Sequence, residues 1–456
     1  MGFATPHPWH RWGLDLESND RQSDAQIRKA TRDSLSTSPA YPTGLKHAAT
    51  EELLGGTLDS AEKRRKIVLV CHSFLPNLGG VESHVYMLAR ELVKRNFEVV
   101  VMTNALTIKR SRFLFPKAST RRKHQENLGG IRVIRCWFFL DFVFCLLNQS
   151  RDAYLVHVHG PYVPYPLALS LLRVKMDCFN AIQSVRELFQ KPIVCTLHGL
   201  HLRFGPELAF LDFLALDSAD WVIAVDSEMR NDLIAIGKRN VSYIPNGIDD
   251  SQLWRERDNR SLKPSSRTFS IICPRRLDIK NGIEYGILAF KELVSHYVPN
   301  SNLVITGPGY GDSYEMHLRD LLAESELSGK ARILNGLDHA SLMQKISESD
   351  LALFPSLWES TSIAAIECLS RGVPVVAFNT GGLRDIVEDG YNGFLVPPKD
   401  VSGMASCAAK LLMSGELYAQ MSRNARVSSE KFQWSELESH VLRVYSLAVL
   451  RRATRP

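Results

Sequence analysis

Two carboxylates, Glu359 and Glu367, stand eight positions apart in the stretch Trp358–Gly372, which reads WESTSIAAIECLSRG. Eight residues advance a helix by about 80° beyond two full turns, so two mid-helix carboxylates at this spacing would point in different directions. If Glu359 instead lies in a loop and Glu367 at least one turn into a helix, both can face one ligand. Free backbone N–H groups at the helix start would then lie between them and would suit a phosphate. These N–H groups belong to Ser360, Thr361, Ser362 and Ile363.

The apolar neighbours of Glu367 favour a functional role for this carboxylate over a solvated one. Glutamate is a good helix former, and most helical glutamates face water. Residues 363–366 and 368–369 are nevertheless all apolar. A carboxylate inside so apolar a helix is rarely buried without a partner. We therefore expect Glu367 to face a ligand.

A strand–loop–helix–strand unit is predicted to position the two carboxylates. An apolar strand, Asp350–Phe354, precedes the loop, and a second one, Pro374–Phe378, follows the helix. In such a unit the helix N-terminus lies beside the carboxyl edge of a parallel sheet.

The same alternation of strands and helices covers most of the chain and predicts an α/β fold with two doubly wound parallel sheets. The strands expected in the first sheet are Ile67–Cys71, Phe97–Met102, Ile131–Arg135, Tyr154–Val158, Ile193–Leu197, Trp221–Val225 and Val241–Ile244. Those expected in the second sheet are Phe269–Cys273, Asn302–Thr306, Arg332–Leu334, Asp350–Phe354, Pro374–Phe378 and Phe394–Val396. Two such domains joined by one linker imply that they face each other across a cleft.

Composition along the chain predicts five segments. Residues 1–65 are polar without a sustained period, which indicates a disordered extension. The first domain is expected over 66–250, a linker rich in charge, Pro and Ser over 251–268, and the second domain over 269–430. The last segment, 431–456, is predicted to be a helix that packs back on the first domain.

Two glycine-rich turns follow predicted strands. Gly79 and Gly80 lie between the first strand and a helix, and Gly307 and Gly309 follow the strand Asn302–Thr306. Glycine lets the backbone approach a phosphate or a sugar closely. Turn chemistry alone is the alternative for both pairs. Neither turn is a GxGxxG motif, so a dinucleotide site is not indicated.

Three further polar side chains are expected at the carboxyl ends of strands. Arg276 and Lys280, in PRRLDIKNG, would suit a diphosphate, although surface loops are commonly basic and a solvated role stays open. His198, in TLHGLH, can donate a hydrogen bond or move a proton, and a structural histidine is the alternative. His201 is a second candidate in the same motif.

Motif content and cysteine usage limit the cofactors and the compartment. The sequence contains no DxD and no HExxH, so we expect neither a metal ion nor a cofactor. The eight cysteines include no CxxC pair, which favours reduced thiols and a cytoplasmic location. The net charge of +6 permits contact with anionic lipid, but no nucleic-acid-binding module is recognised.

Two stretches bear on membrane contact. The insert Ile108–His124 is basic with an apolar centre, and it is either a solvated loop or a patch that touches an anionic membrane surface. The apolar run Cys136–Leu147 is too short to span a bilayer and contains Asp141, so it is predicted to be a core helix or part of the same surface. A peripheral membrane association is therefore compatible with the sequence.

As an ordered set, these motifs resemble the retaining glycosyltransferases of family 4, whose glycosyltransferase-B fold has two Rossmann-like domains. The resemblance covers about residues 66–450. It is carried, in order, by NLGGVESHV, TLHG, YIPNGID, PRRLDIKNG, TGPGYGD, PSLWESTSIAAIE and RGVPVVAFNTGGLRDIVEDGYNGFLVPP. The stretch GGVESHVYMLA also resembles the catalytic subunit of the transferases that add N-acetylglucosamine to phosphatidylinositol.

The resemblance implies roles for the charged residues. Glu367 would bind the ribose of the donor, and Glu359 would contact the donor sugar. Arg276 and a lysine would hold the diphosphate. Where the family pattern R-L-x-x-x-K-G has its lysine, this chain has Asn281, so the lysine role is assigned to Lys280.

The remaining site residues also receive roles from the resemblance. Gly79 and Gly80 would line the donor phosphate and the acceptor side. Asn246 would lie near the cleft hinge, and His198 would hydrogen-bond the donor sugar near the reacting carbon. Gly307 and Gly309 would lie where the second sheet faces the cleft.

The function implied is retaining, metal-independent transfer of a hexose-type sugar from a UDP- or GDP-sugar to a lipid or glycan acceptor. Arg276, Lys280 and the helix start at Ser360–Ile363 would stabilise the charge that grows on the leaving diphosphate. His198 and Glu359 would act beside the reacting carbon. Two alternatives stay open: a sugar-nucleotide epimerase or hydrolase, and a non-catalytic subunit that binds a nucleotide sugar.

Overall fold

The structure is a computed structural model of the whole chain. It describes residues 64–77, 79–105, 124–137, 139–160, 184–199, 216–217, 219–249, 251, 268–309, 311, 313–325, 327 and 329–454. His201, nearly all of the extension predicted over 1–65, most of the basic insert and most of the linker lie outside these residues.

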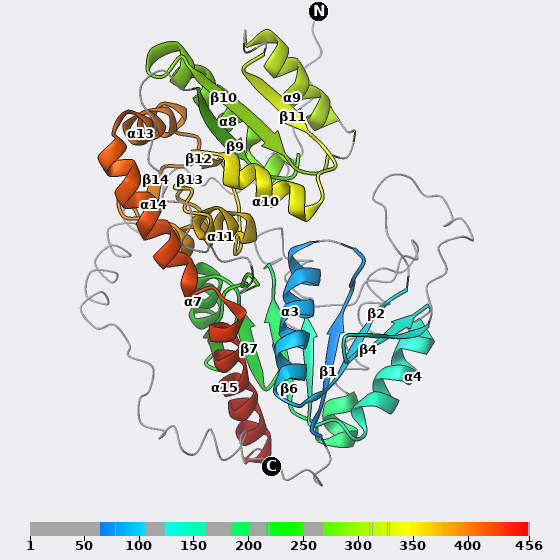
Figure 1. Cartoon of the computed structure of the whole chain (residues 1–456). Coiled ribbons are helices and arrows are strands. Elements are labelled where there is room, and N and C mark those ends of the chain that lie inside the picture. The colour runs from blue at the N-terminus through cyan, green and yellow to red at the C-terminus, as the bar shows by residue number, and fades with distance from the viewer. Residues whose placement is uncertain are drawn as a thin grey trace, which may run out of the picture. The chain divides into compact units, whose positions relative to one another are not determined.

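Eight strands form the first sheet, in the order β3-β4-β2-β1-β5-β6-β7-β8 (Figure 1). Their bounds are β1 Lys66–Cys71, β2 Glu98–Asn104, β3 Gln125–Leu128, β4 Ile131–Cys136, β5 Leu155–His159, β6 Ile193–Leu197, β7 Trp221–Ala224 and β8 Val241–Tyr243. β1, β5 and β6 are buried along their whole length, as expected for parallel strands covered on both faces. Among the strands that the structure describes, β3, at the edge, is the one that pairs antiparallel, with β4. Its polar sequence QENL carries no apolar signal, which is why the sequence did not predict it.

Within the described residues, the helices that lie between strands of the first sheet are α3 Gly80–Lys94, α4 Phe139–Ser150 and α7 Ser227–Ala235. α4 contains most of the apolar run 136–147. It buries Phe142 and Leu146 in a core with β1 and β2, while Leu140 and Phe144 are exposed. The run is therefore a half-buried helix. Among the helices of the described residues, none combines the length and the apolar character that crossing a bilayer requires.

Six parallel strands form the second sheet, in the order β11-β10-β9-β12-β13-β14. Their bounds are β9 Phe269–Cys273, β10 Ser301–Thr306, β11 Ala331–Leu334, β12 Leu351–Phe354, β13 Val375–Phe378 and β14 Gly393–Val396. The helical elements between and after them are η5 Ile279–Asn281, α8 Ile283–His296, α9 Ser313–Glu324, α10 His339–Glu348, α11 Ile363–Ser370, α12 Leu383–Ile386, α13 Val401–Met413 and α14 Gly415–Glu430.

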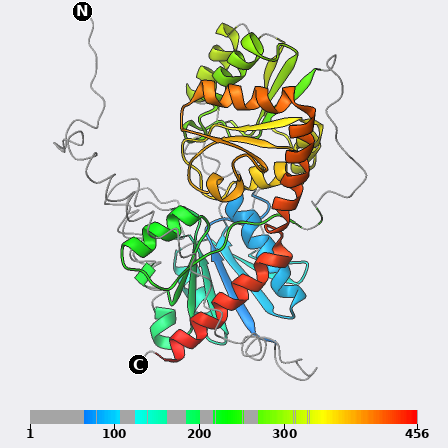
Figure 2. The same cartoon turned by 90° about the vertical axis from the view of Figure 1, so that its left-hand side faces the viewer.

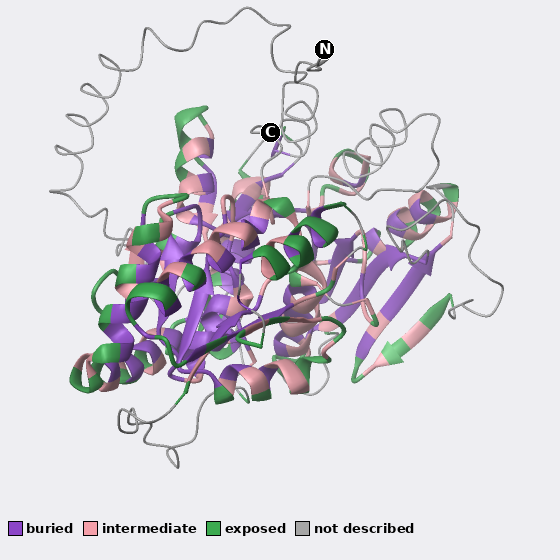
Figure 3. Cartoon of the chain, turned by 90° about the horizontal axis from the view of Figure 1, so that it is seen from above, coloured by how far each residue is buried: buried purple, intermediate pink, exposed green. Residues whose placement is uncertain are grey.

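Alternate residues of β12 show that the second sheet is doubly wound. Leu351 and Leu353 pack in a core with α8 and α13, whereas Ala352 and Phe354 pack in another core with α10 and α11. Successive side chains of a strand point to opposite faces, so helices cover both sides of the sheet. In Figure 3, which colours the chain by burial, most strands are buried and the outer faces of many helices are exposed. The α/β fold with two doubly wound sheets is confirmed.

The strand order reverses at the centre of each sheet, and such points are where α/β proteins bind ligands. In the second sheet β9 lies between β10 and β12, so the loops after β9 and β12 leave side by side at the carboxyl edge. In the first sheet β1 lies between β2 and β5. The loop that contains Gly79 and Gly80 follows β1, and β5 ends at His159.

The last helix, α15 (Trp434–Ala453), packs on α3 and on strands β6 and β7 of the first sheet (Figure 2). Tyr445 Oη lies 2.8 Å from His157 Nδ1, and Glu438 forms an ion pair with Arg95. The chain thus returns to its first sheet after completing the second.

Candidate functional site

Two loops meet at the reversal point of the second sheet. The loop after β9 carries Arg275 and Arg276 and ends in η5, and the loop after β12 carries Glu359 and leads into α11. The backbone N–H of Leu357 donates to the carbonyl oxygen of Lys280, which ties the loops together. Side chains from both loops can therefore act on one ligand.

Arg275 lies at the centre of this pair of loops. Its Nη1 donates to Ser362 Oγ over 3.1 Å and its Nη2 donates to Asn281 Oδ1 over 2.6 Å. Nη2 also forms an ion pair with the Glu359 carboxylate, and only 10% of the Arg275 side chain is exposed. Burial lowers the pKa of Arg275 to about 10, so the guanidinium remains charged at neutral pH. The loop sequence alone did not indicate a role for Arg275.

Ser362 immediately precedes α11, where a side chain commonly caps the helix. Its hydroxyl makes no capping hydrogen bond and accepts from Arg275 instead. The first-turn N–H groups of α11 are thus left without a side-chain cap, and such groups attract anions. Glu359 lies in the loop, and Glu367 lies in the second turn of α11, which begins at Ile363.

Glu367 is buried and has a protein partner. Its Oε1 accepts a hydrogen bond of 2.7 Å from Nε2 of His339, the first residue of α10. This contact raises the pKa of His339 above its usual value. The partner that so buried a carboxylate needs is therefore supplied at least partly within the chain, by a residue that the sequence analysis did not consider.

The two cations that the sequence favoured lie elsewhere in the loop after β9. The side chain of Arg276 is exposed, and its carbonyl oxygen accepts from Asn281 Nδ2 over 2.8 Å. Lys280 Nζ lies 5.2 Å from the centre of the Trp358 ring. Asn281 thus bridges the backbone of Arg276 and the guanidinium of Arg275.

The glycines at the end of β10 allow close packing against the loop after β9. A Cβ atom on Gly307 would overlap the carbonyl oxygen of Arg275, and one on Gly309 would overlap the carboxylate of Glu315. Gly307 therefore fixes where the backbone of Arg275 lies. In the structure these glycines support the loop that carries the cations.

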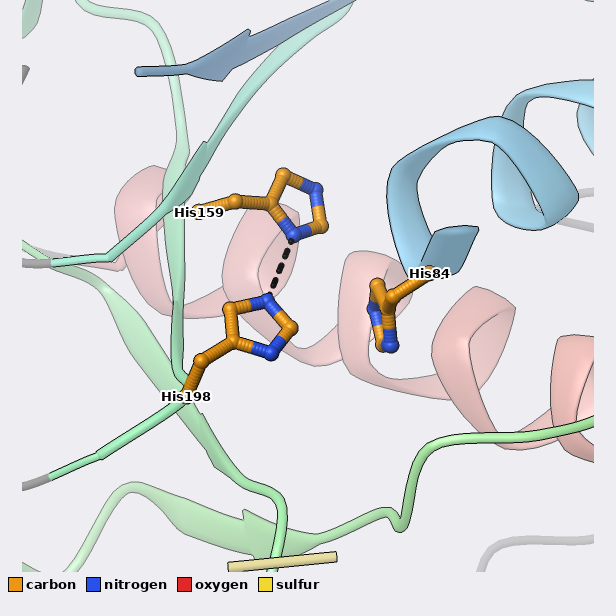
Figure 4. Close-up of side chains that lie close together, drawn as sticks. All are labelled: His84, His159 and His198. Carbon is orange, nitrogen blue, oxygen red and sulfur yellow. Dashed lines mark hydrogen bonds between the residues drawn. The ribbon is translucent and has the colours of Figure 1, made fainter. Parts of the chain in front are cut away.

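The first sheet contributes a cluster of histidines. His198 follows β6, His159 ends β5 and His84 lies on α3 (Figure 4). His159 Nδ1 and His198 Nε2 are 3.4 Å apart, and the ring of His84 is centred 4.8 Å from that of His198. His157 lies next to His159, with ring centres 4.1 Å apart. The structure thus surrounds His198 with three histidines that the sequence analysis did not select.

Burial keeps all four histidines neutral. It lowers the pKa of His84 to about 4, and it holds the pKa of His157, His159 and His198 well below the usual value. A neutral imidazole has one N–H donor and one acceptor nitrogen. The cluster can therefore hydrogen-bond hydroxyl groups without adding charge.

Asn246 joins the histidine cluster to the loop after β12. Its Oδ1 accepts from His84 Nδ1 over 2.8 Å, and its backbone N–H donates to Thr361 Oγ1 over 3.3 Å. The Thr361 hydroxyl in turn donates to the carbonyl oxygen of Val225. Thr361 is thereby held against the carboxyl edge of the first sheet.

Glycines in the first domain allow its backbone to pack closely against the loop after β12 and the start of α11. A Cβ on Gly80 would lie 3.9 Å from Ile363 Cδ1, and one on Gly199 would lie 3.3 Å from the Trp358 ring. Gly79 has an extended backbone, and a Cβ there would meet only the flexible side chain of Glu82.

One ring nitrogen from each of His84, His159 and His198 lies within 4.8 Å of the other two. Metals favour neutral imidazole nitrogens, so this trio is the part of the described site with suitable ligands. In the structure, however, Asn246 engages His84 Nδ1, and His159 and His198 share a hydrogen bond. The rings are held in place by protein contacts.

The two halves of the chain match two family models. Residues 78–252 match the model described as Glycosyltransferase Family 4, and residues 255–428 match the model described as Glycosyl transferases group 1.

Individual proteins are similar over most of the chain. The phosphatidyl-myo-inositol mannosyltransferase of Mycolicibacterium smegmatis is 25% identical over 393 residues, which cover 83% of this chain and 93% of that protein. One subunit of the phosphatidylinositol N-acetylglucosaminyltransferase of Arabidopsis thaliana is 24% identical, over 71% of this chain and 69% of that protein. The Anabaena protein HepE, solved in complex with UDP and glucose, superposes with a TM-score of 0.65 at 18% identity, over 84% of this chain and 100% of HepE.

Proposed function

The chain belongs to the family 4 glycosyltransferases and has their glycosyltransferase-B fold, and on this premise we propose that it moves a hexose-type sugar from UDP to a lipid acceptor with retention of anomeric configuration. One observation carries the proposal. The buried, charged Arg275 and the uncapped start of α11 converge at the point where the second sheet reverses its strand order. This arrangement suits a diphosphate leaving group.

The donor is proposed to bind mainly to the second sheet. Glu367 holds the ribose hydroxyls, and Glu359 contacts the sugar. The uracil base is preferred to guanine because HepE, a structural neighbour, was solved with UDP; a GDP-sugar is the other outcome of the test below. Arg276 and Lys280, which lie in the same loop as Arg275, are proposed to meet the outer diphosphate oxygens.

In the chemical step one bond breaks, one bond forms and one proton is transferred. The bond between the anomeric carbon and the diphosphate oxygen breaks, and the acceptor hydroxyl oxygen attacks that carbon from the same face. The acceptor proton passes to the departing phosphate oxygen. Fixed positive charge lowers the barrier because negative charge grows on the diphosphate as the bond lengthens. His198 donates to a sugar hydroxyl beside the reacting carbon and orients it.

A phosphoinositide-type lipid is the proposed acceptor. Two relatives are named for glycosyl transfer to phosphatidylinositol. On α4, Leu140 is 77% exposed and Phe144 is 71% exposed, one turn apart. His124, which follows the basic stretch 108–123 in the sequence, has its Nδ1 4.0 Å from the Asp141 carboxylate of α4. Exposed apolar side chains combined with a basic sequence favour contact with an anionic membrane surface.

Product analysis tests the proposal. The protein is incubated with UDP-glucose, UDP-N-acetylglucosamine or a GDP-sugar, with and without vesicles that contain phosphatidylinositol, in buffer with EDTA. We expect nucleotide release that requires the vesicles, and a new glycolipid whose anomeric configuration, read by NMR, equals that of the donor.

Other outcomes would identify the alternatives. Free sugar formed without vesicles indicates a hydrolase, and an isomerised donor indicates an epimerase. Nucleotide-sugar binding without any turnover, with every acceptor tried, supports a non-catalytic subunit. An inverted product contradicts the proposed retention, and activity that disappears in EDTA and returns with a metal ion contradicts metal independence.

A further inference from the structure

The apolar helix α4 contains a carboxylate, Asp141, and a thiol, Cys145, that sugar transfer does not use. They are four positions apart, so they share one face of the helix. Cys145 Sγ lies 3.5 Å from Asp141 Oδ1, and the other carboxylate oxygen, Oδ2, accepts from the backbone N–H of Trp137 over 2.9 Å. One oxygen of Asp141 thus binds the backbone just before α4, and the other is turned to the thiol.

The β3–β4 ladder brings a histidine to the same place. His124 directly precedes β3, and its carbonyl oxygen accepts from the backbone N–H of Arg135 over 2.8 Å. Its ring Nδ1 lies 2.9 Å from the carbonyl oxygen of Arg135 and 4.0 Å from the Asp141 carboxylate. One ring nitrogen of His124, one carboxylate oxygen of Asp141 and Cys145 Sγ all lie within 4.8 Å of one another.

A second thiol lies beside these three groups. Cys136 ends β4, is fully buried and belongs to the core against which Cys145 packs. Burial raises the pKa of Cys136, and the neighbouring Cys145 thiol and Asp141 carboxylate raise it further. Two thiols, a carboxylate and an imidazole therefore meet where β4 leads into α4.

We propose that His124, Cys136, Asp141 and Cys145 form a structural zinc site that cross-links the start of β3 to α4. Thiolate and imidazole ligands select zinc over magnesium and calcium, which prefer oxygen alone. Four protein ligands make a closed, tetrahedral site of the structural kind. The inference does not rest on the proposed function, since none of the four residues belongs to the donor site or to the histidine cluster.

The separations are close to those between ligands of one zinc ion. Bonds of about 2.3 Å to sulfur and about 2.1 Å to oxygen, at a tetrahedral angle, place the two ligand atoms about 3.6 Å apart. Cys145 Sγ and Asp141 Oδ1 are 3.5 Å apart. The His124 side chain is 50% exposed, so its ring can adjust to the ion without disturbing the core.

Binding exchanges protons for the ion. Zinc takes thiolates, so Cys136 and Cys145 each release a proton to water as a zinc–sulfur bond forms. His124 Nδ1 donates to a carbonyl oxygen, which can only accept, so in the neutral ring the lone pair is on Nε2. A backbone carbonyl on the second ring nitrogen is a common partner of a histidine that ligates a metal.

The ion fixes the helix that carries exposed apolar side chains. Leu140 and Phe144 each directly precede a zinc ligand on α4. β3 lies at the edge of its sheet, and the ion gives it a second attachment. Zinc in this site stabilises the fold and takes no part in sugar transfer.

Metal titration of the full chain tests the site. The protein is kept reduced with a phosphine, stripped with a chelator and titrated with Co²⁺, which occupies zinc sites and reports their geometry. We expect the strong visible absorption of tetrahedral cobalt and the near-ultraviolet band of cobalt–thiolate bonds, both removed by one equivalent of Zn²⁺. A weak octahedral spectrum without a thiolate band would overturn the proposal.

Thermal unfolding gives a second readout. Zinc at 100 times its dissociation constant adds about 2.7 kcal/mol to stability, which should raise the unfolding temperature by about 3 °C. The dissociation constant for UDP should stay within about twofold with and without zinc. A failure of the zinc site and a failure of the proposed function are therefore distinguishable.

Single variants locate the ion. Cys145→Ser and His124→Gln each remove one ligand, and each should weaken zinc binding at least about 100-fold, because losing even a residue that only orients a ligand costs 10-fold to 100-fold. The matched control is Cys407→Ser, which removes another half-buried thiol, on α13, and should change zinc affinity less than about twofold.

Two results would contradict the site. One is the absence of zinc and cobalt binding in folded, reduced protein. The other is binding that survives in Cys145→Ser and His124→Gln and is lost in His84→Gln, which would place the ion at the histidine cluster. If Cys145→Ser does not fold, as judged by circular dichroism, His124→Gln changes a half-exposed side chain and still decides.

Discussion

The carboxyl edges of the two sheets carry opposite kinds of polar group. The first sheet presents four neutral histidines, three of them buried and His198 half-buried. They contact one another, Asn246, Thr196 and Tyr445. The second sheet presents charged groups in pairs, Arg275 with Glu359 and His339 with Glu367.

This difference indicates which part of a nucleotide sugar each edge can bind. A diphosphate carries charge and needs a fixed opposite charge to replace water. Sugar and inositol hydroxyls are neutral and need donors and acceptors without net charge. The second sheet is therefore suited to the nucleotide diphosphate, and the first sheet to the sugar and the acceptor. Each prediction below tests this division between the two sheets.

The largest expected effect is the response of the histidine cluster to acid. Burial lowers the pKa of His84 to about 4 and that of His157 well below its usual value. As the pH falls, the unfolded chain therefore protonates these histidines before the folded chain does. The free energy of unfolding is highest above about pH 6.5 and falls as the pH drops below that value. Each such histidine lowers the free energy of unfolding by about 1.4 kcal/mol per pH unit, between its pKa in the unfolded chain and its lower pKa in the folded chain.

Urea unfolding at pH 7, 6 and 5 measures this slope. His157→Gln removes one titrating ring while leaving a group that can still bond Thr196 and Tyr445. We expect the variant to lose stability less steeply than the wild type, by about 1.4 kcal/mol per pH unit. Parallel slopes would show that His157 is not a buried neutral group.

The next effect concerns the charged edge. Glu359→Gln keeps the shape of the side chain but leaves Arg275, which is 10% exposed, without its carboxylate. An uncompensated buried charge is unfavourable by about 3 kcal/mol. Urea unfolding at pH 7 should show a loss of this order. As a control, Glu348→Gln, which removes the half-exposed partner of Lys345, should change stability by less than about 1 kcal/mol. Equally small losses of stability in the two variants would contradict the claim that Glu359 compensates the charge of Arg275.

The third prediction separates turnover from donor binding. His198→Ala should lower kcat about 100-fold, because a positioned hydrogen-bonding or proton-transferring group contributes at least that much. The dissociation constant for UDP should change less than about threefold, since the diphosphate lies at the other edge. His296→Ala, an exposed histidine at the end of α8, is the control and should leave both quantities unchanged. A large loss of UDP affinity in His198→Ala would place the diphosphate at the histidines.

The smallest effect is at the His339–Glu367 pair. The carboxylate raises the pKa of His339 above its usual value of 6.5. The pair therefore contributes stability that is present below pH 6.5 and lost as the pH rises through the higher pKa of the folded state. The His339 side chain is 48% exposed, so solvent screens the pair and the contribution should be below about 1 kcal/mol.

Thermal unfolding of His339→Gln measures this contribution. The wild type should be more stable than the variant at pH 6, and the two should converge by pH 8. If the stability difference between the wild type and His339→Gln grew with pH, the charged His339–Glu367 pair would not be stabilising.

The sequence predicted the strands of both sheets well because buried parallel strands are continuous apolar runs. β6 and β9 have the predicted bounds. β3 was missed, since an edge strand such as QENL needs no apolar face. The place of Glu359 in a loop and of Glu367 in a helix followed from the strand before them and the apolar helix after them.

The partners within the site were harder to predict. Arg275 and Arg276 are adjacent, and a loop sequence does not show which of two neighbouring side chains is buried. His339 precedes Glu367 by 28 positions and meets it only because α10 and α11 cover the same face of the sheet. The histidines come from α3, β5 and β6, and the strand order that gathers them is set by tertiary packing. The alternation LVHVH in β5 is the one local signal that two histidines share a face.

The most direct test of the division between the edges is ligand-induced stabilisation in buffer with EDTA. The wild-type protein is unfolded thermally with UDP, GDP, UDP-sugars, uridine or free glucose. A ligand at 100 times its dissociation constant adds about 2.7 kcal/mol to stability. We predict stabilisation by UDP and UDP-sugars that requires the diphosphate and is lost in Arg275→Met. Stabilisation by uridine equal to that by UDP, or none by any nucleotide in folded protein, would contradict a diphosphate site at the charged edge.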